Sequence, residues 1–135
     1  MEEYIVAYAA GLIDGEGSIL LSRNSKQDRF RCPCVSMAST THELLDFMKK
    51  NFGGTICTKK KRAQRHHKTA YVWHLQYDAA LQFLGLVQPF LQEPSKKMRA
   101  TMLIEHHKNL TPRNGRYTAD QTARKLEFEE RFLST

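Results

Sequence analysis

Apolar residues recur every three or four positions near the start of the chain, and this spacing predicts an amphipathic helix over about residues 4–13. The repeat is formed by Tyr4, Ile5, Tyr8, Leu12 and Ile13. It stops at Gly15 and Gly17, where the C-terminus of a helix is expected. A second repeat of leucine, methionine and phenylalanine predicts a helix over about residues 41–52 that ends at a pair of glycines.

Runs of alternating polar and apolar residues predict strands between these helices. The clearest run is Tyr71 to Tyr77, where aromatic residues and leucine alternate with valine, histidine and glutamine. Further strands are expected over about residues 19–23, 30–37 and 55–62, so that the strands form two hairpins. Pro33 predicts a bulge or an unpaired stretch in the second strand.

The order helix, hairpin, helix, hairpin, helix predicts an α+β fold. A repeated helix–hairpin unit indicates one antiparallel four-stranded sheet with helices covering one face, so the other face stays available to a partner. Further helices are expected over about residues 78–87 and around residues 100–104. A mixed-charge helix from Thr118 to Phe132 is predicted to pack at the periphery.

Length and composition fit a single globular domain. The chain has 135 residues, of which 41% are hydrophobic, which is enough to bury a core. We expect one domain over residues 1–135, with a core of about 4–108 and a C-terminal helical extension of about 116–133. The longest apolar run is far shorter than the roughly 18 to 20 residues of a membrane span, and the first residues do not resemble a signal peptide. Three cysteines do not make a disulfide framework, so reduced thiols inside a cell are expected.

The charge is positive and unevenly distributed along the chain. Lysine and arginine number 21 against 14 aspartate and glutamate, a formal net charge of +7. Basic residues crowd both predicted hairpins, at Arg23, Lys26, Arg29 and Arg31 in the first and at Lys59, Lys60, Lys61, Arg62, Arg65 and Lys68 in the second. Such a surface fits a DNA duplex, because cations hold the phosphates while strand side chains reach the base edges. The alternative is a solvated charge run on exposed turns.

The segment Ala10 to Ser18, AGLIDGEGS, carries two carboxylates flanked by glycines. Its glycines follow a helix instead of preceding one, which argues against a phosphate cradle at a helix N-terminus. A helix C-terminus has free carbonyls and partial negative charge, and Glu16 adds a carboxylate. This end of the helix therefore suits a hard cation such as Mg²⁺.

The stretch Ala9 to Gly17, AAGLIDGEG, resembles the signature motif of the LAGLIDADG homing endonucleases. It differs from that motif by Ala9 for leucine, Gly15 for alanine and Glu16 for the second aspartate. The resemblance extends over about residues 5–106, because the order of helices and hairpins falls where the family places it. It implies a saddle-shaped sheet and a site-specific endonuclease of intron or intein mobility that cuts both strands of a long, near-palindromic DNA target.

The resemblance also implies the catalytic residues. Glu16 is the implied metal-binding carboxylate, with the carbonyl of Gly15 nearby, and Mg²⁺ is the implied cofactor, for which Mn²⁺ can substitute. Divalent ions between the two active sites would activate a water and stabilise the leaving 3′ oxygen. Lys96 falls where the family has a basic residue that polarises the scissile phosphate or the water, and Lys97 is its rival. Asp14 is expected to cap and link the paired helices.

Only one copy of the motif is present, and single-motif chains of that family are homodimers whose motif helices pack on the two-fold axis. Small residues on one helical face, which let two backbones approach closely, form the implied interface: Ala7, Ala10, Gly11 and Asp14. The alternative is a helix packed against its own core.

The chain departs from the family at the start of the second helix, where other members have a glutamine and an arginine. Ser39, Thr40 and Thr41 stand there instead, so a role in positioning water would fall to a hydroxyl or to none. For Thr40, capping of the helix together with Glu43 is the favoured role.

Strand alternation in the family's phase gives the side chains expected to face DNA. On the first hairpin they are Ser22, Asn24 and Lys26, with Arg31 and Ser36, and on the second they are Thr58, Lys60, Arg62, Val72, His74 and Gln76. Cys57, Tyr71, Trp73 and Leu75 are expected to face the helices. Arginine and lysine suit readout of guanine, and glutamine suits readout of adenine.

We therefore expect a homodimeric, Mg²⁺-dependent DNA endonuclease whose partner is double-stranded DNA, with no membrane and no small-molecule substrate. It is expected in the cytoplasm or nucleoid of a prokaryote or phage-infected cell, or in an organelle. The alternative is a non-cleaving DNA- or RNA-binding protein on the same scaffold, such as a maturase-like splicing cofactor or a transcription regulator. Glu16 and the two lysines favour the enzyme.

Overall fold

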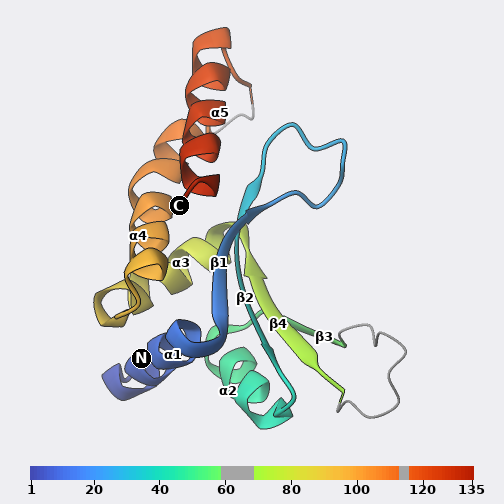
Figure 1. Cartoon of the computed structure of the whole chain (residues 1–135), viewed down its shortest axis with the longest axis vertical. Helices are drawn as coiled ribbons and strands as arrows, with labels where there is room; N and C mark the ends of the chain where they lie inside the picture. Colours follow the sequence, from blue (N-terminus) through green and yellow to red (C-terminus); the bar gives the residue numbers. More distant parts are fainter. Residues whose placement is uncertain (59–68, 113–115) are drawn as a thin grey trace.

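A computed structural model describes residues 1–58, 69–112 and 116–135 (Figure 1). The helices are α1 (Glu3–Glu16), α2 (His42–Phe52), α3 (Tyr77–Val87), α4 (Pro94–Met102) and α5 (Ala119–Leu133), with helical turns η1 (Gln88–Phe90), η2 (Leu103–His107) and η3 (Lys108–Leu110). The strands are β1 (Gly17–Ser22), β2 (Cys32–Ser39), β3 (Thr55–Thr58) and β4 (Tyr71–Gln76). The predicted order of helices and hairpins is confirmed.

The strands form one antiparallel sheet in the order β1–β2–β4–β3, which confirms the predicted α+β fold. The two hairpins join through β2 and β4, where Ser36 lies opposite His74. Pro33 lies opposite Leu21 in an unbroken register with β1, so the predicted bulge is wrong. Pairing of β2 with β4 begins only at Cys34. Pro33 is therefore tolerated because β2 has a single neighbour at that point.

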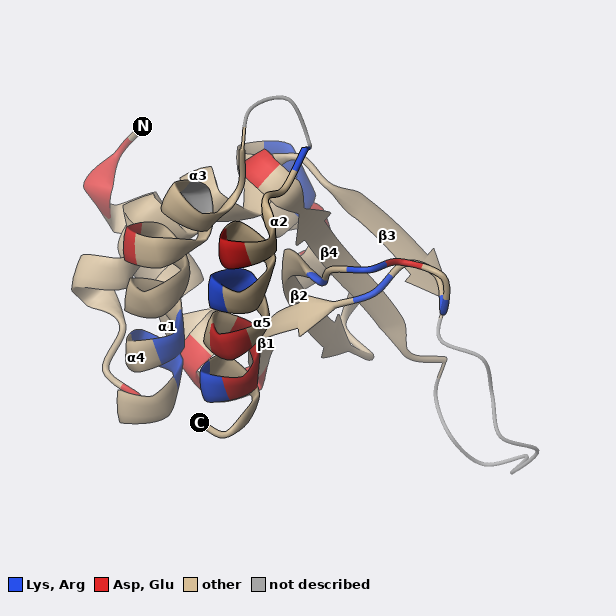
Figure 2. Cartoon of the chain, turned by 90° about the horizontal axis from the view of Figure 1, so that it is seen from above, with Lys and Arg blue, Asp and Glu red and all other residues tan. Residues whose placement is uncertain are grey.

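The helices lie on one side of the sheet, and the other side is left uncovered (Figure 2). Alternate residues of the central strands, such as Val35 and Trp73, are fully buried against this helical layer. Ile13 of α1 and Leu84 of α3 are also fully buried in the same cluster. One core thus holds the sheet and the first three helices together.

Two glycines are required where the chain turns sharply. At Gly17, where α1 passes directly into β1, an added Cβ would lie 2.7 Å from the Cα of Ile13. Gly54 has φ +92°, and a Cβ there would lie 2.6 Å from the carbonyl oxygen of His74. Gly17 therefore fixes the tight turn that immediately follows Glu16.

The C-terminal helix is more than the peripheral element that the sequence predicts. Phe128 and Phe132 of α5 are almost fully buried in the main core. Thr118 caps the helix by accepting a hydrogen bond from the Gln121 amide, and the Gln121 side chain accepts one from the Thr118 amide. Within the described ranges, no helix is both long and apolar enough to cross a membrane.

Candidate active site and nucleic-acid interface

Glu16 is the last residue of α1 and its side chain is exposed. No other residue in the described part of the chain hydrogen-bonds to its carboxylate. Gly15 precedes it in the final turn, where backbone carbonyls lack partners within the helix. The predicted metal residues thus form an open, negatively polarised end of α1.

Asp14 connects this end of α1 to the start of α4. Its two carboxylate oxygens accept hydrogen bonds from the backbone amides of Gln92, at 2.9 Å, and Glu93, at 3.1 Å. The Glu93 carboxylate in turn caps α4 by accepting from the amides of Ser95 and Lys96, and these amides lower the pKa of Glu93. The Asp14 side chain therefore links two helices of its own chain, and its place in an interface between two copies stays a prediction.

Lys96 of α4 makes a second contact between α4 and α1. Its ammonium donates to the carbonyl oxygens of Ile13, at 2.9 Å, and Asp14, at 2.7 Å. The Ile13 carbonyl also accepts from the Gly17 amide, so the lysine adds a second donor there and supplies a donor to the Asp14 carbonyl near the end of the helix. The structure thus brings Lys96 to the end of α1 that carries Glu16.

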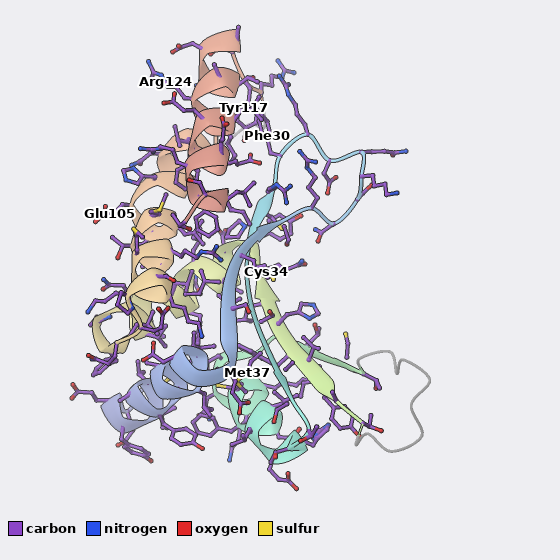
Figure 3. All side chains as sticks on the ribbon, viewed as in Figure 1. Phe30, Cys34, Met37, Glu105, Tyr117 and Arg124 are labelled. Atoms are coloured by element: carbon purple, nitrogen blue, oxygen red, sulfur yellow. The ribbon has the colours of Figure 1, made fainter. Side chains whose placement is uncertain are left out.

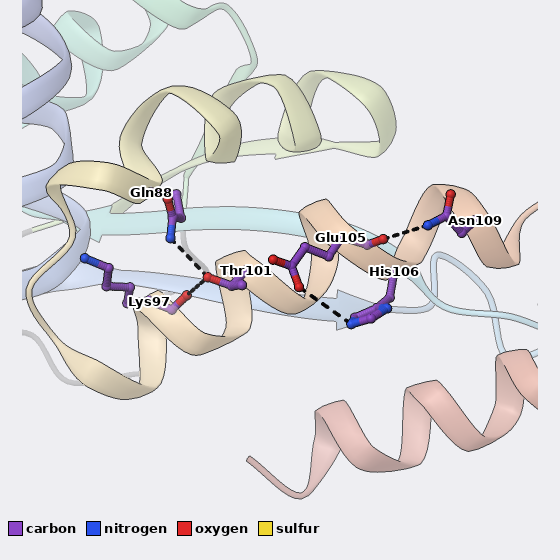
Figure 4. A network of polar contacts seen from close by, with 6 residues as sticks. All are labelled: Gln88, Lys97, Thr101, Glu105, His106 and Asn109. Atoms are coloured by element: carbon purple, nitrogen blue, oxygen red, sulfur yellow. Dashed lines mark hydrogen bonds and ion pairs between the residues drawn. The ribbon is translucent and has the colours of Figure 1, made fainter.

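Lys97, the rival candidate, takes part in a different network (Figure 4). Its carbonyl oxygen accepts a hydrogen bond from the Thr101 hydroxyl, at 2.9 Å, and this hydroxyl also accepts from the Gln88 amide. In the close-up the Lys97 side chain extends away from Thr101. Of the two lysines, only Lys96 has a side-chain hydrogen bond to α1 within the described part of the chain.

The residues of α1 predicted to pair with a second copy divide between two faces. Ala10 is fully buried against its own core, so its predicted place in an interface is wrong. The physical reason is that the helix turns Ala10 into the core together with Val6 and Ile13. Gly11 is exposed and Ala7 is half-buried. A Cβ added at Gly11 or Gly15 would meet nothing within 4 Å, so this face of α1 is open.

The start of α2 differs from the predicted capping box. Thr41, not Thr40, is the N-cap, and it makes no side-chain capping hydrogen bond. The amide of Thr41 instead donates to the hydroxyl of Ser39, at 3.0 Å. The predicted capping role of Thr40 is therefore wrong, because the helix begins one residue later than the sequence pattern indicates.

The uncovered face of the sheet carries polar side chains from every strand. Ser18 and Ser22 of β1 alternate with the buried positions, and Ser36, His74 and Gln76 follow the same phase on the central strands. On β3 the phase is opposite to the prediction, because Cys57 pairs with Val72 and Thr58 pairs with Tyr71. Cys57 thus lies on the uncovered face and Thr58 on the helical side, which corrects both predictions. The strand begins directly after the Gly53–Gly54 turn, and that start sets its register.

The arrangement of α1, the helical layer and the open sheet matches solved structures, although no protein-family model and no curated protein matches the chain. I-CvuI, a homing endonuclease solved in complex with a DNA target in the presence of 2 mM Mg, is 20% identical with a TM-score of 0.74, over 98% of this chain and 82% of that chain. The archaeal intron-encoded I-Vdi141I, complexed with DNA, is 18% identical with a TM-score of 0.62, over 99% and 85% of the two chains. I-GzeII, a LAGLIDADG homing endonuclease solved with its DNA target, is 16% identical with a TM-score of 0.62, over 96% of this chain and 42% of that chain.

The chain has the fold of the LAGLIDADG homing endonucleases. In this LAGLIDADG fold the motif-like segment, Ala9 to Gly17, forms the second half of α1 and the turn into β1. The element that carries Glu16 therefore runs directly into a strand of the uncovered face.

The β1–β2 loop of this LAGLIDADG fold extends beyond the sheet and carries several basic residues (Figure 2). Lys26 is exposed at the turn, and Asp28 stabilises the turn by accepting from the amides of Asn24 and Ser25. Arg31 is half-buried, and its guanidinium donates to the carbonyl oxygen of Leu21. Lys60 and Arg62 of the second hairpin lie outside the described residues.

Sequence reasoning missed the polar contacts that attach α5 to this loop. Lys125 and Glu129 are only 2% and 4% exposed. The Glu129 carboxylate accepts from the Arg31 amide, while the Lys125 ammonium donates to Thr111 and lies over the Phe30 ring, 5.5 Å from its centroid. Burial raises the pKa of Glu129 and lowers that of Lys125.

Aromatic packing completes the junction between the loop and α5. The rings of Phe30 and Tyr117 lie 4.4 Å apart between centroids, and Figure 3 shows them side by side where the loop meets the helix. The buried face of α5 could not be identified from the sequence, because it includes Lys125 and Glu129 and these residue types normally indicate an exposed position.

Proposed function

We propose that this protein is a LAGLIDADG homing endonuclease, which acts inside the cell and cuts both strands of a long, near-palindromic DNA site as a homodimer. The observation that carries the proposal is the end of α1, where Glu16 is exposed and the Lys96 ammonium is bound to the backbone carbonyls of Ile13 and Asp14, beside an uncovered four-stranded sheet. The homing endonucleases I-CvuI and I-Vdi141I, which share this fold, were solved in complex with DNA.

The donor atoms at this end suit a divalent cation. The Glu16 carboxylate is exposed and engages no other described residue, and the last carbonyls of α1 offer further oxygen atoms. Hard oxygen donors are the ligands that Mg²⁺ and Mn²⁺ prefer. When bound, such ions activate water and stabilise the leaving 3′ oxygen.

One chain supplies only part of such a site. Over the described residues, no group of three histidine, cysteine, aspartate or glutamate side chains could hold a metal. The remaining oxygen donors would come from DNA phosphates and from Glu16 of a second protomer. This incomplete donor set supports a homodimer in which two copies of α1 meet.

The open face of α1 also supports pairing of two copies. Small residues follow one another along it at Ala7, Gly11 and Gly15, and the exposed rings of Tyr4 and Tyr8 flank them. Because a Cβ at either glycine meets nothing, a second helix has room to approach the backbone.

Lys96 supplies a positive charge that is already in place before DNA binds. An ammonium group has three N–H donors, and two of them are used by the carbonyls of Ile13 and Asp14. The third is available to a phosphate oxygen or to the attacking water. Asp14 is assigned a positioning role and not a role as a metal ligand, because both of its carboxylate oxygens accept hydrogen bonds from amides at the start of α4.

The proposal is tested by selecting cleaved molecules from a library of random DNA, with Mg²⁺ in one arm and EDTA in the other. We expect a long, near-palindromic consensus with Mg²⁺ and none with EDTA. Glu16→Gln is expected to abolish cleavage and to retain binding, because it removes a ligand charge and leaves the basic surface intact. Glu43→Gln, an exposed glutamate on α2, is the matched control and should cleave normally. Selective binding without cleavage by the unaltered protein would favour the non-cleaving alternative.

A further inference from the structure

A chain of hydrogen bonds joins the two hairpins on the uncovered face of the sheet. The Gln76 side-chain amide donates to the carbonyl oxygen of the Asn24 side chain, at 2.8 Å. The Asn24 amide nitrogen donates in turn to the Tyr77 hydroxyl, also at 2.8 Å. Gln76 ends β4, Tyr77 begins α3 and Asn24 lies in the β1–β2 loop, so three separate elements meet in this chain.

Tyr77 has a backbone conformation that tyrosine rarely adopts. Its φ is +57°, the only positive φ of a non-glycine residue in the described ranges. Glycine or asparagine is usual at such a position, and a bulky residue there indicates that the side chain is needed. β4 passes into α3 without an intervening loop, and the left-handed residue makes that turn. The strained residue is also the one whose hydroxyl ends the hydrogen-bonded chain.

Two thiols lie beneath this chain of side chains. Cys34 is directly opposite Gln76 in the register of β2 and β4, and Cys32 lines one cavity with Tyr77, whose pKa it raises. Both cysteines are only 7% exposed although they lie on the face that no helix covers. Burial, with Cys32 close by, raises the pKa of Cys34, so that thiol stays protonated. The two buried thiols thus lie next to the hydrogen-bonded side chains of Asn24, Gln76 and Tyr77.

The hydrogen bonds determine which way the Gln76 amide points. A glutamine amide has two N–H donors and one carbonyl oxygen, and one of these donors is held by Asn24. The carbonyl oxygen and the second N–H remain available. That pair matches adenine in the major groove, which presents the N6 donor and the N7 acceptor. The carbonyl of the Asn24 side chain is occupied, so Asn24 orients Gln76 rather than forming a two-bond contact of its own.

We propose that Tyr77 and Asn24 are positioning residues that fix the Gln76 amide for the recognition of one adenine in each half of the DNA target. The inference rests on the proposed function, since it assigns a base preference to the uncovered face. Neither Tyr77 nor Cys32 was among the residues that the sequence pattern selected.

Base preference at each position of the selected target tests this inference in four forms of the protein: unaltered, Tyr77→Phe, Gln76→Ala and the double variant. Tyr77→Phe keeps the ring and the backbone and removes only the hydroxyl. We expect it to lower the preference for adenine at one symmetric pair of positions by about tenfold, the lower part of the range for a two-bond contact. In the Gln76→Ala background the same change should have no further effect, because there is no amide left to orient.

Two further variants separate positioning from a structural effect. Tyr117→Phe removes a hydroxyl elsewhere and should leave the base preference unchanged. Asn24→Asp still accepts from Gln76, and the Tyr77 hydroxyl can turn to donate to it, so the adenine preference should persist while the added negative charge weakens binding at every sequence.

The outcomes distinguish this inference from the function on which it rests. If the unaltered protein shows no sequence preference, both fail. If it is selective but Tyr77→Phe leaves the adenine preference unchanged, or lowers it equally without Gln76, then only the positioning role is overturned. An unchanged midpoint of thermal unfolding in Tyr77→Phe shows that any loss of preference does not come from unfolding.

Discussion

Two side chains with opposite charges bind the end of α1 to the start of α4, and each does so through the backbone of the other helix. Asp14 accepts from amides at the start of α4, while Lys96 donates to carbonyls at the end of α1. Each charge complements the partial charge of the helix end that it meets. The position of Glu16 is thereby tied to α4, although the two residues are far apart in the sequence.

The two lysines should differ in both stability and activity. Lys96→Met removes the lysine donor of the Asp14 carbonyl and one of the two donors of the Ile13 carbonyl, and we expect the free energy of unfolding to fall by about 1 to 3 kcal/mol. We also expect cleavage to be lost. Lys97→Met, the matched control, should change neither quantity appreciably. Denaturant unfolding and a plasmid cleavage assay measure both, and normal cleavage by Lys96→Met would remove this residue from the active site.

His107 should make stability depend on pH. Burial, with Lys125 as a lesser cause, lowers the pKa of His107 to about 4 from its ordinary 6.5. Between these values the unfolded chain binds a proton that the folded chain does not, so stability is complete above about pH 6.5 and decreases as the pH falls toward 4. The loss amounts to no more than about 3 kcal/mol.

The effect of His107 is isolated by comparison with His107→Gln. We expect the difference in unfolding free energy between the two proteins to change between pH 7.5 and pH 4.5, with the unaltered protein losing more stability. Glu129, whose pKa is raised by burial, acts in the opposite direction over part of this range but is common to both proteins. An unchanged difference would mean that His107 accepts its proton without cost in the folded state.

At the scale of elements, α5 contacts residues 29–31 at the end of the β1–β2 loop, which carries several basic residues. The Glu129 carboxylate accepts from the Arg31 amide, and the Thr122 hydroxyl accepts from the Arg29 guanidinium. Thr122 and Glu129 lie about two turns apart on one face of the helix. These two hydrogen bonds hold Arg29 and Arg31, at the end of the loop that leads into β2, against α5.

Removing the Glu129 carboxylate should detach the end of the loop at Arg31 from α5. We expect Glu129→Ala to leave the half-buried Arg31 amide unpaired, to lower the free energy of unfolding by about 2 kcal/mol and to speed amide hydrogen exchange in residues 23–31. Glu130→Ala changes the adjacent, exposed glutamate and is the control. Equal exchange in the two variants would show that α5 does not order the loop.

The elements were predictable where the hydrophobic pattern is regular and less so where charges are buried. The order of helices and hairpins follows from spacing alone, and Trp73 is buried as its alternation with His74 predicts. Thr58 was assigned to the wrong face because a four-residue strand after a glycine turn gives too few positions to fix the phase. Lys125 and Glu129 gave no signal of burial, since their partners lie far away in the sequence.

The candidate site was predictable only in part. The segment that ends in Glu16 identified the end of α1, but the choice between the two lysines required the fold. Ala10 and Gly11 are adjacent small residues, and the sequence pattern placed both of them in the predicted interface between two motif helices. In the structure Ala10 is buried in the core and Gly11 faces outward, because a helix rotates about 100° at each residue.

At the scale of the whole molecule, the open face of α1 should decide whether the protein acts as two copies. We expect Gly11→Leu to fold as a monomer, because a Cβ there meets nothing within 4 Å in its own chain while a leucine side chain would block the approach of a second helix. Sedimentation should show dissociation, and cleavage of a palindromic target should be lost. Gly85→Leu, a substitution at another exposed helical glycine with open space, is the control. Full activity of a monomeric Gly11→Leu protein would contradict the homodimer.

The pairing of β2 with β4 has a consequence for altering the target of such a protein. The two hairpins look like separate modules, each of which could be exchanged or randomised without regard to the other. The hydrogen bond between Asn24 of the first hairpin and Gln76 of the second connects the two hairpins. A library that varies one hairpin while keeping the other constant would break that bond in most of its members, so retargeting has to vary residues 24, 76 and 77 together.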